Sequence, residues 1–148
     1  MTPDPLRILL AEDDDGHARL IERNLKRAGF INEVVRARDG QEALDLVYAR
    51  PPGSGQFLLL LDINMPRIDG VEVLRLLKAD PRTAKTPVIM LTTTDDPREV
   101  ERCYRYGCSV YITKPLRYED FVDALTRLGM FLEIIKFPAT PDDPPRPS

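Results

Sequence analysis

The sequence predicts an α/β fold, a three-layer αβα sandwich built on a five-stranded parallel sheet. Short apolar runs alternate with amphipathic segments along the chain, as expected of repeated βα units. The runs at 57–61 and 88–91 are continuously apolar, which is typical of strands that are buried on both faces. With 148 residues, 43% of them hydrophobic and 30% charged, the chain has the size and composition of one globular domain.

Each element follows from the period of its apolar residues and from the residues at its ends. The predicted strands are 6–11, 33–37, 57–61, 87–92 and 109–113, and the predicted helices are 16–28, 40–49, 70–78, 97–106 and 118–136. Three helix starts place an Asp three residues before a Glu, at Asp39, Asp69 and Asp96. An Asp side chain there can cap free backbone N–H groups. Gly29 and Gly107 are typical of helix ends.

The spacing of the polar residues that follow the strands predicts the strand order 2-1-3-4-5. The interval from Asp13 to Asp62 is about twice the intervals from Asp62 to Thr92 and from Thr92 to Lys114, and each is long enough for a right-handed crossover. An extra strand at the sheet edge, 33–37, explains the longer interval. The first and third strands are then neighbours, and ligands of open parallel sheets bind beyond the carboxyl ends of such strands.

Four predicted strands end in residues that can act together on a phosphoryl group: Glu12 and Asp13, Asp62, Thr92, and Lys114. Adjacent carboxylates raise each other's pKa unless a cation intervenes, and an oxygen-rich group of ligands suits Mg²⁺. The ion, the ammonium and the hydroxyl would together neutralise phosphoryl oxygens. The expected product is an aspartyl phosphate.

These motifs resemble the receiver domain of bacterial two-component response regulators, over approximately residues 6–136. The resemblance is carried by the acidic pair, the block 61–66 with Asp69-Gly70, the Thr92 segment, and the block 111–115. It implies a phosphoprotein that takes its phosphoryl group from a sensor histidine kinase. Such proteins are signalling proteins rather than classical enzymes, although they assist their own phosphorylation and dephosphorylation.

The resemblance also implies a role for each residue. The phosphoacceptor is Asp62; the metal ligands are Glu12, Asp13, Asp62 and the backbone carbonyl of Asn64; the phosphate-binding and switch residues are Thr92, Lys114 and Tyr111. Pro115 is expected to be a cis proline. Thr93 and Thr94 offer alternative hydroxyls, and Tyr111 suits rim packing equally well. His17, the single histidine, is expected to be a surface residue.

The end of the chain predicts a subgroup and a partner. No output domain follows the last predicted helix, so a stand-alone receiver is expected. The loop 51–56, the long last helix and the ending 131–138 resemble receivers associated with bacterial phytochrome histidine kinases. Those receivers resemble one another in forming homodimers through the side of the fourth helix, fifth strand and last helix.

The last predicted helix has a second apolar face that one small sheet cannot bury. The residues expected to make a dimer contact there are Met130, Phe131, Ile134 and Phe137. The alternative is that residues 138–148, a proline-rich tail expected to be disordered, fold back over this face. The folded receiver domain is therefore expected to span residues 1–137.

Composition argues against several classes of partner. The net charge of −3 and the pI near 5.2 do not favour nucleic acid or an anionic membrane. No apolar stretch is long enough to span a bilayer, and the N-terminus lacks the features of a signal peptide. Cys103 and Cys108 have no partners at metal-ligand spacing and are expected to be reduced thiols of a cytoplasmic protein.

Two further functions stay open beside phosphorylation-controlled signalling. An Mg²⁺-dependent phosphohydrolase would also form an aspartyl phosphate, but Asn64 occupies the position of its general acid. A phosphorylation-independent scaffold or a flavodoxin-like FMN binder would also suit the fold. The acids that follow the first predicted strand would, however, repel the phosphate of FMN.

Overall fold

A computed structural model describes residues 7–27, 33–49, 57–93, 96–114, 117, 119–120 and 123. The five parallel strands form one sheet in the order β2-β1-β3-β4-β5. They are β1 (Arg7–Ala11), β2 (Val34–Ala37), β3 (Phe57–Asp62), β4 (Val88–Thr92) and β5 (Val110–Thr113). The predicted parallel sheet and its strand order are confirmed.

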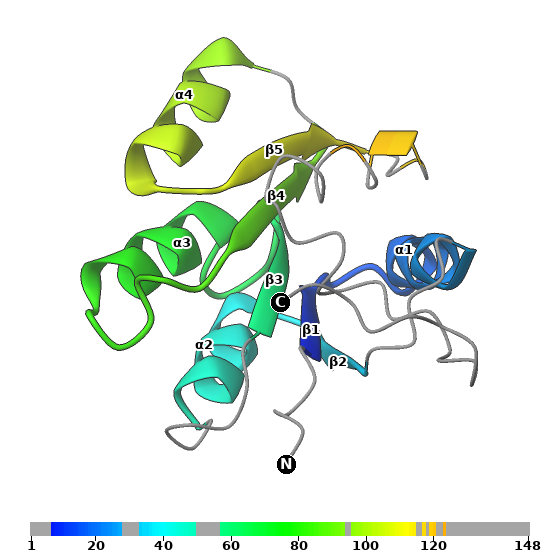
Figure 1. The fold of residues 1–148 in the computed structure, drawn as a ribbon, viewed down its shortest axis with the longest axis horizontal. Helices are drawn as coiled ribbons and strands as arrows, with labels where there is room; N and C mark the ends of the chain where they lie inside the picture. Colours follow the sequence, from blue (N-terminus) through cyan, green and yellow to red (C-terminus); the bar gives the residue numbers. More distant parts are fainter. Residues whose placement is uncertain are drawn as a thin grey trace, which may run out of the picture.

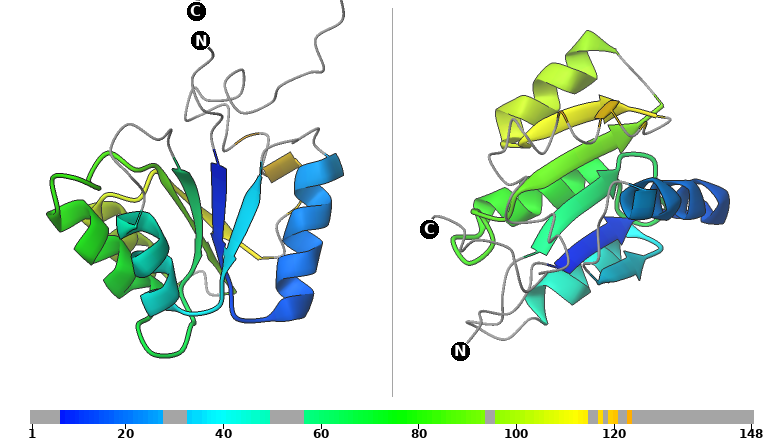
Figure 2. Two further views of the ribbon diagram at one scale, coloured as in Figure 1. Left: turned by 90° about the horizontal axis from the view of Figure 1, so that it is seen from below. Right: turned by 45° about the vertical axis from the view of Figure 1, so that its right-hand side comes forward.

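The described helices cover both faces of this sheet. They are α1 (Asp15–Arg27), α2 (Gly40–Tyr48), α3 (Gly70–Ala79) and α4 (Pro97–Tyr106). Helix α1 lies on one face, whereas α2, α3 and α4 lie side by side on the other (Figures 1 and 2). The predictions that lie outside the described residues are Gly29, the loop 51–56, Thr94, Pro115, most of the helix 118–136, Phe137 and the tail 138–148.

The core is centred on β3 and β4, in which every residue is buried. This agrees with the continuous apolar runs of the sequence. Burial of each large apolar side chain there stabilises the fold by about 1.5–3 kcal/mol relative to exposure. The register pairs Ala11 with Leu61 and Asp62 with Leu91. The residues that follow the strands therefore meet at one edge of the sheet.

Side-chain caps hold the helix starts where the sequence predicts them. The carboxylates of Asp39 and Asp69 accept hydrogen bonds from the backbone N–H three residues later, at 2.8 and 2.9 Å. Asp96 instead accepts from the N–H of Arg98, two residues later, at 3.0 Å. Gly107 ends α4 with φ at 101°, a left-handed conformation that costs glycine little.

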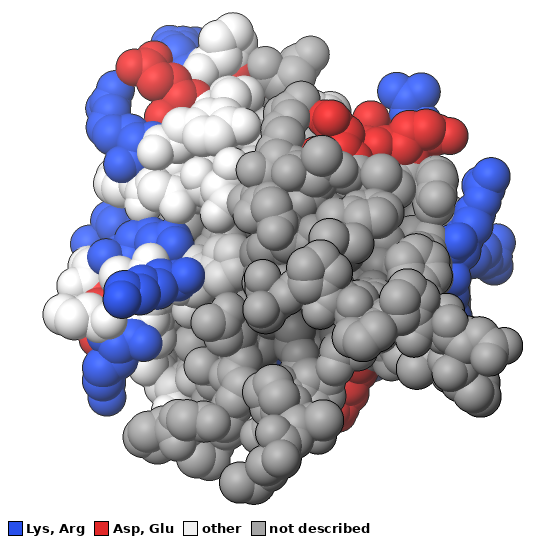
Figure 3. Space-filling model, in the orientation of Figure 1, with Lys and Arg blue, Asp and Glu red and all other residues white. Residues whose placement is uncertain are grey.

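Lys and Arg side chains gather along the edge where α3 and α4 lie (Figure 3). Several of them pair with a nearby acid: Arg75 with Glu72, Arg82 with Asp80, and Arg105 with Glu101. Exposed pairs of this kind each contribute little to stability. These acids offset part of the positive charge along this edge.

The described helices do not have the length and apolar content that a membrane crossing requires.

Candidate functional site

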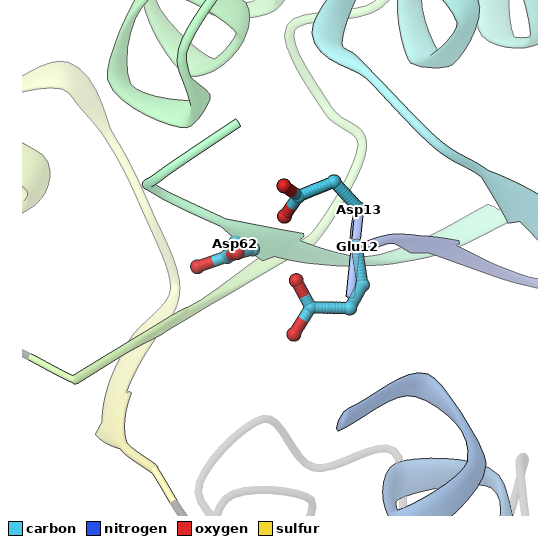
Figure 4. A group of neighbouring side chains, drawn as sticks. All are labelled: Glu12, Asp13 and Asp62. Atoms are coloured by element: carbon cyan, nitrogen blue, oxygen red, sulfur yellow. The ribbon is translucent and has the colours of Figure 1, made fainter. Parts of the chain in front are cut away.

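Three carboxylates gather beyond the ends of β1 and β3. Oxygen atoms of Glu12, Asp13 and Asp62 lie within 4.8 Å of one another, and the three side chains lie side by side in Figure 4. Glu12 and Asp62 are buried, whereas Asp13 is exposed. The adjacency of β1 and β3 brings together acids that are far apart in the sequence.

The Lys114 ammonium connects two of these acids. It forms an ion pair with Glu12 Oε1 and lies 3.4 Å from Asp62 Oδ2. The side chain of Lys114 is 8% exposed, that of Glu12 is 1% exposed and that of Asp62 is 6% exposed. Charges this well shielded from water interact more strongly than surface charges. The backbone N–H of Lys114 also donates to the carbonyl of Thr92 at 2.7 Å, so the ends of β4 and β5 are joined at the site.

Burial and the neighbouring acid give Asp62 an unusual proton affinity. Loss of hydration and the neighbouring Glu12 together raise the pKa of Asp62 to about 7, against a smaller lowering by Lys114 and the N–H of Asn64. Burial acts to raise the pKa of Glu12 as well. There, hydrogen bonds with Asp62 and Lys114, together with the charges of Lys114 and His17, outweigh burial and hold the pKa of Glu12 below its ordinary value. The raised pKa of Asp62 and the lowered pKa of Glu12 thus share one cause, the contact between the two carboxyl groups.

The donor atoms of this cluster fit a hard divalent cation. Glu12 Oε2 is buried and has no hydrogen-bond partner among the described residues. An unpaired buried carboxylate oxygen is costly, and a cation would supply its missing partner. Three carboxylates at one sheet edge are oxygen ligands of the kind that Mg²⁺ prefers. The residues present therefore fit Mg²⁺.

The affinity for Mg²⁺ is expected to fall as the pH drops from 8 to 6. Asp62, whose pKa is about 7, must lose its proton before it can bind a cation, so metal binding releases a proton. Below the pKa of Asp62, the dissociation constant should rise up to about tenfold per pH unit. Calorimetric titration at pH 6, 7 and 8 measures this change, with Asp62→Asn as a control whose weaker affinity should vary much less. Equal wild-type affinity at the three pH values would contradict the prediction.

A cavity of about 190 Å³ opens at this edge of the sheet. Its lining residues are Glu12, Asp13, Asp14, His17, Asp62, Asn64, Thr93 and Lys114. One water molecule occupies about 30 Å³ of the liquid, so the cavity has room for a phosphoryl group. The predicted acids and Lys114 all face this space.

The two predicted switch residues lie apart from this lining. Thr92 is fully buried at the end of β4, and it is Thr93 that lines the cavity. The assignment of the hydroxyl to Thr92 therefore stays a prediction, with Thr93 as one alternative; the other, Thr94, lies outside the described residues. Tyr111 is partly buried on β5 and packs against the core, and its backbone N–H donates to the hydroxyl of Tyr104 at 3.2 Å. Its role as a switch also stays a prediction.

His17 is a site residue that the sequence reasoning missed. Its side chain is 49% exposed, as expected of a surface residue, but Nδ1 lies 3.4 Å from both Glu12 Oε1 and Lys114 Nζ. The sequence feature that could have indicated this position is Asp14, three residues before His17. Its carboxylate accepts a hydrogen bond from the N–H of His17 at 2.9 Å and so caps α1. This cap holds His17 in the first turn of α1, beside the cavity.

Comparison with known proteins agrees with this geometry. Residues 8–126 match the family described as the response regulator receiver domain. The probable methanogenesis regulatory protein FilR2 of Methanothrix harundinacea is 39% identical over 119 residues, which make up 79% of this chain and 77% of that protein.

Solved structures extend the likeness to three dimensions. A response regulator receiver domain from Rhodospirillum rubrum is 44% identical, with a TM-score of 0.71 over 89% of this chain and 96% of that one. The bacteriophytochrome response regulator AtBRR is 33% identical, with a TM-score of 0.77 over 95% of this chain and 100% of that one. On these matches, which span most of its length, the chain belongs to the response regulator receiver-domain family.

Proposed function

We propose that this chain accepts a phosphoryl group from a sensor histidine kinase on Asp62. The observation that carries the proposal is the position of this carboxylate, which borders an open cavity between Lys114 and two further acids. Receiver domains as a family take phosphoryl groups from histidine kinases, and an acidic Mg²⁺ pocket is general among them. The specific roles of these residues are our proposal.

The proposed reaction is transfer from a phosphohistidine. An oxygen of Asp62 attacks phosphorus, the phosphorus–nitrogen bond breaks, and the leaving imidazole nitrogen keeps the electron pair. Lys114, already held 3.4 Å from Asp62 Oδ2, donates hydrogen bonds to the phosphoryl oxygens. Its ammonium balances negative charge that gathers there in the transition state.

Mg²⁺ would be held by Glu12, Asp13, Asp62 and the backbone carbonyl of Asn64, and it would add positive charge beside the phosphoryl oxygens. The low pKa of Glu12 keeps that ligand ionised at neutral pH. The peptide after Asp62 is held by the N–H of Asn64, which donates to Asp62 Oδ1 at 3.3 Å. The residues of the chain thus hold the acceptor carboxylate in place before the donor arrives.

Phosphorylation of Asp62 would alter the surface formed by α4 and β5. The hydrogen bond from Lys114 N–H to the Thr92 carbonyl joins the ends of β4 and β5, and Tyr111 connects β5 to α4 through Tyr104. A movement of Lys114 toward a phosphoryl group would therefore act on both strands. We propose that Thr92 and Tyr111 transmit this movement.

Intact-mass spectrometry tests the proposal directly. After incubation with acetyl phosphate and Mg²⁺, we expect a single phosphoryl adduct on the wild-type protein. The adduct should be absent from the Asp62→Asn variant, which keeps the size of the side chain but lacks the nucleophilic oxygen. Stoichiometric phosphate on that variant would overturn the assignment of Asp62.

Three further observations separate the competing functions. Sustained release of inorganic phosphate from small phosphomonoesters would favour a phosphohydrolase. A wild-type protein that binds Mg²⁺ but gains no adduct, even with histidine kinases, would favour a phosphorylation-independent scaffold. Yellow colour in the purified protein would favour an FMN binder.

The proposal extends to two partners, a sensor kinase and a second copy of this chain. The likeness to a bacteriophytochrome response regulator supports a bacterial phytochrome as the sensor kinase, and so a cytoplasmic protein in light signalling. The predicted homodimer, through Met130, Phe131, Ile134 and Phe137, stays a prediction because these residues lie outside the described part of the chain.

A further inference from the structure

Arg36 holds the loop that carries two of the three acids. It lies on β2, the edge strand beside β1, and its Nε donates to the backbone carbonyl of Glu12 at 2.8 Å. Its Nη2 donates to Asp15 Oδ1 at 3.1 Å. The side chain is 21% exposed, so most of it is covered by its neighbours.

The two bonds span the loop between β1 and α1 from its beginning to its end. Glu12 directly follows β1, and Asp15 is the first residue of α1. A guanidinium is planar, and the directions of its N–H groups are fixed relative to one another. It therefore sets how far the Glu12 carbonyl lies from the Asp15 carboxylate, which a flexible ammonium cannot do.

Both backbone polar groups of Glu12 are hydrogen-bonded to residues of β2. Its N–H donates to the carbonyl of Ala37 at 3.0 Å, and its carbonyl accepts from Arg36. That carbonyl belongs to the peptide that joins Glu12 to Asp13. Its direction therefore decides the direction in which the Asp13 side chain leaves the backbone, and Asp13, being exposed, has little packing to fix it.

We propose that Arg36 is a positioning residue, which holds the Glu12–Asp13 peptide so that the Asp13 carboxylate faces Asp62 and a divalent cation binds without reordering the loop. This inference rests on the proposed Mg²⁺ site. Residues that orient metal ligands without touching the metal typically contribute ten- to a hundredfold in affinity. A loop that must be ordered on binding loses affinity to conformational entropy.

Charge and position predict opposite effects for Arg36. The guanidinium lies near the acids, so loss of its positive charge alone would strengthen binding of a cation. Loss of the held loop would weaken binding. The sign of the change in affinity therefore distinguishes a positioning role from a simple surface charge.

Arg38 provides the matched control. Its Nη1 also donates to Asp15 Oδ1, at 3.3 Å, but its side chain is 65% exposed. Within the described part of the chain it has no bond to the Glu12 carbonyl. Its replacement removes the same charge from the same acid and leaves the loop carbonyl held by Arg36.

The test is a calorimetric Mg²⁺ titration at pH 8 of the wild-type protein and the variants Arg36→Met, Arg36→Lys and Arg38→Met. We expect about tenfold weaker affinity in both Arg36 variants and at most a small strengthening in Arg38→Met. Arg36→Lys keeps the charge, so it remains decisive if Arg36→Met fails to fold by circular dichroism. Phosphorylation by acetyl phosphate should need a higher Mg²⁺ concentration in the two Arg36 variants. Its rate should equal that of the wild-type protein once Mg²⁺ is saturating.

The outcomes distinguish this inference from the proposed function. Wild-type or tighter Mg²⁺ affinity in both Arg36 variants would overturn the positioning role and leave the metal site in place. A wild-type protein that binds no Mg²⁺ would overturn the proposed metal site and the inference together.

Discussion

Replacement of Lys114 with methionine is expected to slow phosphorylation of Asp62 by acetyl phosphate by about 10²–10³-fold. This is the usual cost of removing one donor that stabilises transition-state charge. Methionine keeps most of the length of the side chain but has no positive charge to balance the negative charge of the phosphoryl oxygens. The ammonium is nearly buried between Glu12 and Asp62, so bulk water is poorly placed to replace it. Initial rates of adduct formation, followed by intact mass, measure the effect.

The loss should lie in the chemical step rather than in metal binding. Lys114 is not among the proposed metal ligands, so the variant should still bind Mg²⁺, and more tightly, because a competing positive charge is gone. Lys85→Met, which changes an exposed lysine, controls for net charge and should match the wild-type rate. If Lys114→Met were phosphorylated as fast as the wild-type protein, the assigned role of the ammonium would be wrong.

Gly70→Ala is expected to lower the free energy of unfolding by about 3 kcal/mol, or the midpoint of thermal unfolding by about 10 °C. A methyl group at Gly70 would lie 2.2 Å from the backbone oxygen of Asp62 and 2.8 Å from the Cα of Ile63. Backbone atoms of a fully buried strand cannot move aside as a side chain can. The N–H of Gly70 also donates to the carbonyl of Ile63 at 2.8 Å, which fixes the first turn of α3 against the end of β3.

The same clash should reach the phosphoacceptor, because the atom that must move belongs to Asp62 itself. Thermal unfolding followed by circular dichroism gives the stability, and adduct formation well below the midpoint gives the effect on the site. Gly16→Ala is the control, since its methyl group would meet a side-chain oxygen of Asp14 at 3.2 Å rather than backbone. Equal stability of Gly70→Ala and the wild-type protein would show that α3 can shift away from β3 at little cost.

Much of the fold could be predicted from the sequence because the signals are local. The unbroken apolar runs of β3 and β4 indicate strands buried on both faces, and both strands are fully buried. Asp39 and Asp69 were predicted as helix caps, and each accepts the expected backbone hydrogen bond. Such features depend on a few neighbouring residues, so no knowledge of the packing is needed.

The composition of the acidic cluster was also predictable, once the strand order was inferred from the spacing of the polar residues. The register of β1 with β3 then brings Glu12 and Asp13 to Asp62. The choice between Thr92 and Thr93 could not be made this way. Both follow the same strand, and the side chain that faces the cavity depends on how β4 ends.

The sequence by itself determined the parallel sheet, its strand order and the set of residues at its carboxyl edge, because periodicity, capping and spacing act along the chain. The tertiary structure alone decided three things: the raised pKa of Asp62, the approach of His17 to Lys114 and Glu12, and the reach of Arg36 from β2 to the Glu12 carbonyl. Burial and long-range contacts join residues that are far apart in sequence, and no local pattern records those distances.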